Sequence, residues 1–121
     1  MGRLRVLIAD DHDQMRSYVA TLLAHDFEVV GSVKDGRQLI GAVLSIRPDV
    51  VVTDVSMPRL SGLQAMKDLR SGGYCVPFVL ISSETSESER WIEEGVSAVV
   101  KKIDMFRELV SAVRCASSER S

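Results

Sequence analysis

The regular alternation of two apolar patterns constrains the fold of this chain more than any other feature. Short continuous apolar runs, each bounded by turn or polar residues, predict five strands, at residues 4–9, 27–30, 50–53, 76–81 and 98–100. Between and after them, apolar residues recur every three or four positions, which predicts amphipathic helices. The first and third runs are apolar nearly throughout, as in strands that helices cover on both faces. The pattern therefore predicts an α/β fold with a doubly wound parallel sheet.

Turn-forming residues agree with these boundaries. Asp35 and Gly36 can open the helix that follows the second strand, and Gly72 and Gly73 can close the helix that follows the third. Gly95 can close the helix before the last strand.

The fourth helix, predicted within residues 85–94, is the weakest. Its only apolar anchors are Trp91 and Ile92, which stand among glutamates. Little apolar area is then available to offset the conformational entropy lost on ordering. We expect this helix to be short, exposed and comparatively mobile.

The composition fits a single small domain. A chain of 121 residues holds one domain, residues 1–121, in which the polar, Ser-rich residues 117–121 form a frayed tail. The net charge of −2 comes from 17 acidic and 15 basic residues without a basic block, which argues against direct nucleic-acid binding. Apolar runs of about six residues are far shorter than the ~20 that span a bilayer, and the amino terminus lacks a secretion signal. These features argue against a membrane protein and predict a cytoplasmic location.

Cys75 and Cys115 are far apart in the sequence and belong to no metal-ligand pattern. Cysteines of cytoplasmic proteins stay reduced. We therefore expect two reduced, buried or half-buried thiols rather than a disulfide.

Polar residues stand at the ends of four of the apolar runs: Asp10 with Asp11, then Asp54, Ser82 and Lys102. Because ligands of an open parallel sheet bind outside the carboxyl ends of its strands, these side chains should converge there. Three carboxylates held that close repel one another unless a cation lies among them, and Mg²⁺ is the hard oxygen-binding ion that best fits. A carboxylate nucleophile, a metal, a lysine and a hydroxyl together are suited to handling a phosphoryl group.

Four motifs carry these residues in order. They are LIADDH at residues 7–12, DVSMPRLSG at 54–62, LISS at 80–83 and GVSAVVKK at 95–102. Together they resemble the receiver domains of two-component response regulators across essentially the whole chain. The resemblance implies a flavodoxin-like sheet of five parallel strands in order 2-1-3-4-5, with the site where the strand order reverses.

The resemblance also implies a role for each site residue. Asp54 matches the aspartate that accepts a phosphoryl group from a phosphohistidine. Asp11 matches a direct Mg²⁺ ligand, and Asp10 an acid that reaches the ion through water. Lys102 matches the lysine that pairs with the acceptor and then with the phosphoryl oxygens. Ser82 matches the hydroxyl that moves to the phosphoryl group after transfer.

The loop after Asp54 completes the expected metal site. Pro58 and Gly62 restrict its backbone, so that it can hold the carbonyl of Ser56 toward the metal. We therefore expect Asp10, Asp11, Asp54 and Ser56 to hold Mg²⁺, with Mn²⁺ as an alternative ion.

The implied partners are a sensor histidine kinase or a phosphotransfer protein, and a second copy of the chain is a further candidate. The implied activity is self-phosphorylation that changes a binding surface, not turnover of an external substrate. A DNA-binding effector domain, which many such regulators carry, is absent from this sequence.

Other interpretations stay open from the residues alone. Asp10 and Asp11 also suit the start of a helix, as a cap and a first-turn acid. His12 lies beside them, but an imidazole matches a hard ion poorly and is interpreted as a loop or first-turn residue. Two other functions are a receiver-like interaction module that takes no phosphate, and an aspartyl-phosphate phosphohydrolase. Such hydrolases usually have a second acid two residues after the nucleophile, where this chain has Ser56.

Three features depart from the family pattern. Val99 stands three residues before Lys102, where an aromatic residue or histidine is common, and a stiff branched side chain cannot swing as a ring does. The interval from Ser82 to Lys102 is shorter than usual by about two residues. Ile103 follows the lysine where proline or aspartate is frequent. The departures concern the usual relay of the signal and leave the phosphoryl chemistry intact.

Overall fold

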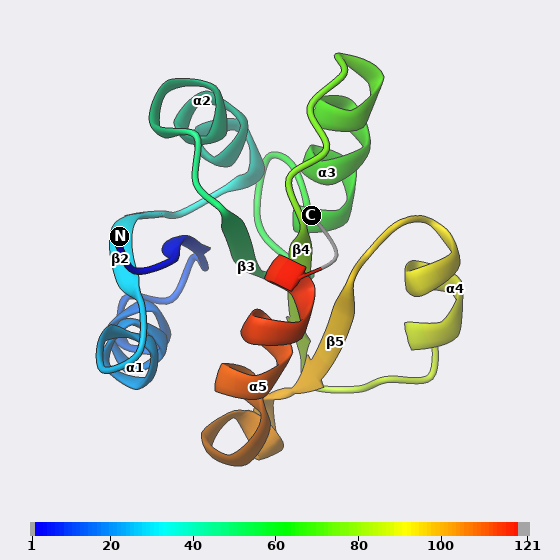
Figure 1. Cartoon of the computed structure of the whole chain (residues 1–121). Helices are drawn as coiled ribbons and strands as arrows, with labels where there is room; N and C mark the ends of the chain where they lie inside the picture. The colour runs from blue at the N-terminus through cyan, green and yellow to red at the C-terminus, as the bar shows by residue number, and fades with distance from the viewer. Residues whose placement is uncertain (1, 119–121) are drawn as a thin grey trace.

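The computed structural model describes residues 2–118, which fold into a five-stranded parallel sheet with helices on both faces (Figure 1). The elements are β1 (Arg5–Ala9), α1 (Asp13–Ala24), β2 (Glu28–Val33), α2 (Gly36–Ile46), β3 (Val50–Asp54), α3 (Gly62–Ser71), β4 (Phe78–Ser82), α4 (Ser88–Glu93), β5 (Ala98–Lys101), a 3₁₀ turn η1 (Lys102–Asp104) and α5 (Met105–Ser118). The strand order is β2-β1-β3-β4-β5, and every pairing is parallel. This confirms the predicted fold class and topology.

The side-chain alternation of the strands divides the core into two layers. On β1, Val6 and Ile8 belong to the layer that also holds buried residues of α1 and α5, whereas Leu7 and Ala9 belong to the layer that holds those of α2, α3 and α4. Figure 1 shows the same division, with α1 and α5 on one side of the sheet. All five residues of β3 are buried, which confirms a strand covered on both faces. The central strands are therefore packed on both faces up to the carboxyl ends at which the polar residues stand.

Several boundaries differ from the predictions, and backbone pairing explains them. The second strand continues to Val33, because Gly31 and Ser32 pair with β1 despite their weak strand propensity. The fourth strand begins at Phe78 instead of residue 76, directly after Pro77, whose nitrogen has no proton to donate.

The last helix is longer than predicted. It runs through Ser118, so that Ser117 and Ser118 are helical and not part of a frayed tail. Their hydroxyls donate to the carbonyls of Arg114 and Cys115, each three positions earlier in the helix, at 2.8 Å. Residues 119–121 of the predicted tail lie outside the described residues.

Helix α4 is as short as predicted, but only one of its two apolar residues anchors it. Trp91 is buried, whereas Ile92 is half exposed. Polar contacts supplement the anchor: Glu94 pairs with Lys67 of α3 at 3.0 Å, and Arg70 of α3 donates to the carbonyl of Gly95.

Both cysteines are free, but the expectation that they are buried or half-buried is wrong. Cys75 lies in the exposed loop before β4, and Cys115 lies on the outer face of α5. Within residues 2–118, no helix has both the length and the apolar character needed to cross a membrane.

Glycines at two positions of α2 should respond oppositely to alanine. A Cβ at Gly36 would collide with the backbone of Leu60, whereas a Cβ at Gly41 meets nothing within 4 Å. We expect Gly36→Ala to lower the free energy of unfolding by about 1–3 kcal/mol. Gly41→Ala should raise it by about 0.5–1 kcal/mol, because glycine is a poor helix former. Urea denaturation of both variants tests this, and equal effects would contradict the close approach of α2 to Leu60.

The cap of α2 should make stability depend on pH. The N–H of Gln38 donates to Asp35, and together with the guanidinium of Arg59 it holds the pKa of Asp35 below its ordinary value. A carboxyl with a lowered folded-state pKa adds stability that is full above about pH 5 and is lost progressively below it. Asp35→Asn keeps a cap acceptor but removes the charge. The difference in urea midpoint between wild type and this variant should therefore shrink on acidification, and a constant difference would contradict the assignment.

Candidate functional site

The predicted site residues converge at the carboxyl edge of the sheet. Asp10 follows β1, Asp54 ends β3, Ser82 ends β4, and Lys102 begins η1 directly after β5. Carboxylate oxygens of Asp10, Asp11 and Asp54 and a ring nitrogen of His12 all lie within 4.8 Å of one another. Asp10 and Asp54 are buried, whereas Asp11 and His12 are exposed. One end of this cluster is therefore desolvated, and the other faces solvent.

Two donors hold the carboxylate of Asp54. The backbone N–H of Ser56 donates to Oδ1 at 3.2 Å, and Nζ of Lys102 donates to Oδ2 at 3.3 Å. The side chain of Asp54 is 5 % exposed and that of Lys102 is 30 % exposed. The neighbouring Lys101 is exposed. A charged, buried carboxylate is thus paired on one oxygen and hydrogen-bonded on the other.

Burial and nearby charges both affect the ionisation of Asp10. Burial raises the pKa of its carboxyl, the N–H of His12 opposes this, and the negative charge of Asp54 raises the pKa further. Its Oδ1 accepts the N–H of His12 at 2.9 Å, and the guanidinium of Arg16 donates to its backbone carbonyl at 3.0 Å. A cation placed among the acids would favour the charged form of this carboxyl and so oppose the rise in its pKa.

His12 lies closer to the site than the sequence interpretation suggested. It is the N-cap of α1 but makes no side-chain capping bond, and its Nδ1 lies 3.2 Å from Asp11 and 3.3 Å from Asp10. Asp10 and Asp11 therefore precede the cap, and the interpretation of the pair as cap and first-turn acid is wrong. The only sequence signal for this contact was the adjacency of the imidazole to the acid pair.

Ser82 is buried at the end of β4, but its hydroxyl has local partners. It donates to the carbonyl of Glu84 and accepts the N–H of the same residue at 3.2 Å. In this state the hydroxyl closes its own turn. Any movement of Ser82 toward Asp54 must first break these two bonds.

The loop between β3 and α3 fits tightly against the strand that carries Asp54. A Cβ at Gly62 would lie 2.6 Å from the carbonyl oxygen of Asp54, so only glycine fits there. On its outer side, Arg59 donates to Asp35 at 2.8 Å. The sequence interpretation missed this contact, because nothing in the local pattern relates two residues that are 24 positions apart.

The donor set suits a hard divalent cation. Three carboxylates from two strand ends lie together, one of them paired with the ammonium of Lys102, and carboxylate oxygen is the ligand that Mg²⁺ and Mn²⁺ prefer. The acidic cluster can therefore hold a metal ion.

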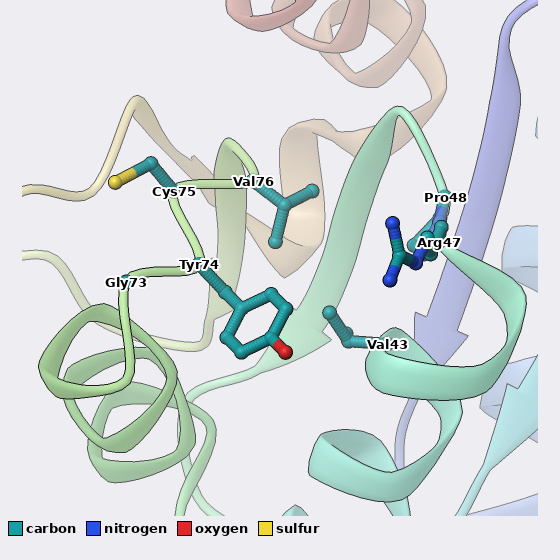
Figure 2. A pocket seen from close by; sticks show the side chains of 7 residues that line it. All are labelled: Val43, Arg47, Pro48, Gly73, Tyr74, Cys75 and Val76. Carbon is teal, nitrogen blue, oxygen red and sulfur yellow. The ribbon is translucent and has the colours of Figure 1, made fainter.

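A cavity of about 460 Å³ lies away from this cluster, at the opposite edge of the sheet (Figure 2). It is lined by Val43, Arg47, Pro48, Gly73, Tyr74, Cys75 and Val76. Figure 2 shows the ring of Tyr74 and the guanidinium of Arg47 on opposite sides of the space. These residues precede β3 and β4 or end α2, so the cavity shares no residue with the acidic cluster.

Comparison with known proteins agrees with the geometry. The family model described as "Response regulator receiver domain" matches residues 6–114. The response regulator MprA of Mycolicibacterium vanbaalenii is 34 % identical over 92 % of this chain and 49 % of its own length. A protein-glutamate methylesterase/protein-glutamine glutaminase of Pyrococcus horikoshii is 37 % identical over 86 % of this chain and 27 % of its own length. The chain thus spans from about a quarter to about half the length of these relatives.

Solved structures show the same fold. The signal receiver domain of the response regulator NarL from Mycobacterium tuberculosis superimposes with a TM-score of 0.90 at 26 % identity, over 98 % of both chains. The response regulator domain of Thermotoga maritima CheB gives a TM-score of 0.88 at 25 % identity, over 96 % of this chain and 97 % of that one. With the acidic cluster at the carboxyl edge and the family match over residues 6–114, this chain belongs to the receiver domains of two-component response regulators.

Proposed function

We propose that this domain accepts a phosphoryl group on Asp54 from a phosphohistidine of a sensor kinase or a phosphotransfer protein. The observation that carries the proposal is the environment of Asp54: a buried carboxylate beside two further acids, with Lys102 on one oxygen and the N–H of Ser56 on the other. This arrangement fixes the direction of the carboxylate, as an in-line displacement requires.

The transfer exchanges one bond for another. A carboxylate oxygen of Asp54 forms a bond to phosphorus, and the bond from phosphorus to the imidazole nitrogen of the donor breaks. The electron pair of that bond stays on the nitrogen of the donor, and the product is an acyl phosphate. Lys102, already 3.3 Å from the carboxylate, then lies close enough to pair with the new phosphoryl oxygens.

In this proposal, the carboxylates of Asp11 and Asp54 and the carbonyl of Ser56 hold Mg²⁺, or Mn²⁺ in its place, and Asp10 acts through water. The ion supplies positive charge that offsets the charge developing on the phosphoryl oxygens. Support for it comes from the clustered acids and from the carboxyl of Asp10, whose pKa is raised mainly by burial and further by the negative charge of Asp54.

In the proposed function, Ser82 links phosphorylation to a change in the binding surface. After transfer, its hydroxyl leaves Glu84 and bonds the phosphoryl group, which pulls on the loop before α4 and changes a binding surface. The surface would contact a second copy of the domain or an effector of the kind found in longer relatives. We place the reaction in the cytoplasm, where the sequence predicts the chain to be.

The domain by itself is not a substrate-turnover enzyme. The methylesterase activity in the name of one relative belongs to a protein of which the matching region is 27 %. The phosphohydrolase alternative lacks support, because the position two residues after Asp54 presents the hydroxyl of Ser56 instead of a carboxyl.

Intact mass measurement tests the acceptor. After incubation with acetyl phosphate and Mg²⁺, the wild type should gain the mass of one phosphoryl group, whereas it should gain none with a chelator. Asp54→Asn should gain none under either condition, because the amide is a poor nucleophile. Modification that persists in this variant would place the acceptor elsewhere, with Asp10 and Asp11 the next candidates. An unmodified wild type would favour the interaction module that takes no phosphate.

Thermal denaturation tests the metal site. Mg²⁺ should stabilise the fold, by about 2.7 kcal/mol when free Mg²⁺ is one hundred times its dissociation constant. Asp11→Asn should lose most of this gain and should also be more stable than wild type without metal, since one of the repelling charges is gone. An unchanged response to Mg²⁺ in this variant would remove Asp11 from the metal ligands.

A further inference from the structure

The β2–α2 turn holds the outer side of the loop that follows Asp54. The guanidinium of Arg59 donates to Oδ2 of Asp35 at 2.8 Å, and the side chain of Asp35 is only 3 % exposed. One residue further along each segment, the N–H of Gly36 donates to the carbonyl of Leu60 at 2.9 Å. Two adjacent contacts therefore join the start of α2 to the loop before α3.

The loop is strained where these contacts hold it. The N–H of Leu60 donates to the carbonyl of Pro58 at 2.7 Å, and Arg59 between them has a φ of 66°. This is the γ-turn with positive φ at its centre, a rare conformation that is costly for a residue with a side chain. Such a conformation persists only where its surroundings determine it, and here the surroundings are Asp35 and Gly36.

The other end of the same loop touches the phosphoryl acceptor. The N–H of Ser56 orients Oδ1 of Asp54 at 3.2 Å, and Ser56 is only three positions before Arg59. Pro58 lies between them and has a nearly fixed φ, so the backbone between Ser56 and Arg59 has little conformational freedom. A displacement at Arg59 is thus transmitted to the N–H that aims the carboxylate.

We propose that Asp35 and Arg59 are positioning residues for phosphoryl transfer: their ion pair holds the strained turn, and the turn holds Ser56 against Asp54. The inference rests on the proposed function and adds two residues that do not touch the reacting atoms. Asp35 also has a second structural role: its Oδ1 accepts the N–H of Gln38 and caps α2. The two roles use different oxygens and can be separated by mutation.

The experiment compares Asp35→Asn, Arg59→Ala and the double variant with wild type. Asparagine still caps a helix, so Asp35→Asn removes the charge pair but keeps the cap. With acetyl phosphate and saturating Mg²⁺, each single variant should lower the initial rate of mass gain about tenfold, since a small misplacement of a reacting group has effects of this order or larger. The double variant should be no slower than either single one, because both remove the same interaction. Arg59→Lys, which keeps the charge, should recover part of the rate.

Amide hydrogen exchange without metal gives a readout that is independent of transfer. The N–H of Ser56 should exchange faster in Asp35→Asn and Arg59→Ala than in wild type, while the amides of β3 stay protected. Urea denaturation identifies any variant that is not folded, and Asp35→Asn with Arg59→Lys provides a milder pair in that case.

A matched control lies at the far end of the molecule. Arg114 of α5 pairs with Asp26 at 2.9 Å, in the turn before β2 and away from the acidic cluster. Asp26→Asn and Arg114→Ala remove a comparable pair and should leave the phosphorylation rate and the Ser56 exchange unchanged.

The outcomes separate the two proposals. A wild type that takes phosphate, with both positioning variants as fast as the Arg114 control and Ser56 equally protected, would overturn the positioning role alone. A wild type that takes no phosphate would overturn the proposed function, and the positioning role with it.

Discussion

The contact between Lys102 and Asp54 is the interaction on which the site depends. It joins the ends of β5 and β3, two strands that are separated by β4 in the sheet. A carboxylate as buried as Asp54, with two other acids nearby, is costly in free energy without a compensating charge. The lysine supplies that charge to one oxygen and leaves the remaining acids, Asp10 and Asp11, open to a cation. The same arrangement thus compensates the buried charge of Asp54 and leaves room for a cation beside the other two acids.

Tight backbone packing supports this electrostatic arrangement. Gly36 and Gly62 allow the loop after Asp54 to lie directly against α2 on one side and β3 on the other, at distances that no Cβ permits. The chain can therefore hold a strained turn at Arg59 that local preferences alone would avoid. The conformation of this loop thus depends on three segments that are distant in sequence, and the N–H of Ser56 in the loop donates to the carboxylate of Asp54.

The site and the output are separate properties of the domain. The relatives include a response regulator and a methylesterase whose matching regions are 49 % and 27 % of their lengths, so one receiver architecture accompanies different activities. In this chain the hydroxyl of Ser82 is engaged with Glu84, and Val99 on β5 offers no ring to reorient. Helix α4 is short and is anchored by the buried side chain of Trp91.

The sequence by itself determined the parts that depend on local pattern: the five strands, their parallel order through resemblance, and the convergence of Asp10, Asp54 and Lys102. Apolar periodicity and the polar residues at strand ends involve neighbouring positions in the chain, so they can be recognised in the sequence alone. Only the tertiary structure decided the partners of these groups, including the ion pair of Asp35 with Arg59 and the local bonds of Ser82. It also decided that the cysteines are exposed and that α5 reaches Ser118. Such contacts depend on which surfaces pack together after folding. A periodic sequence pattern does not predict a contact between residues that are distant in the chain.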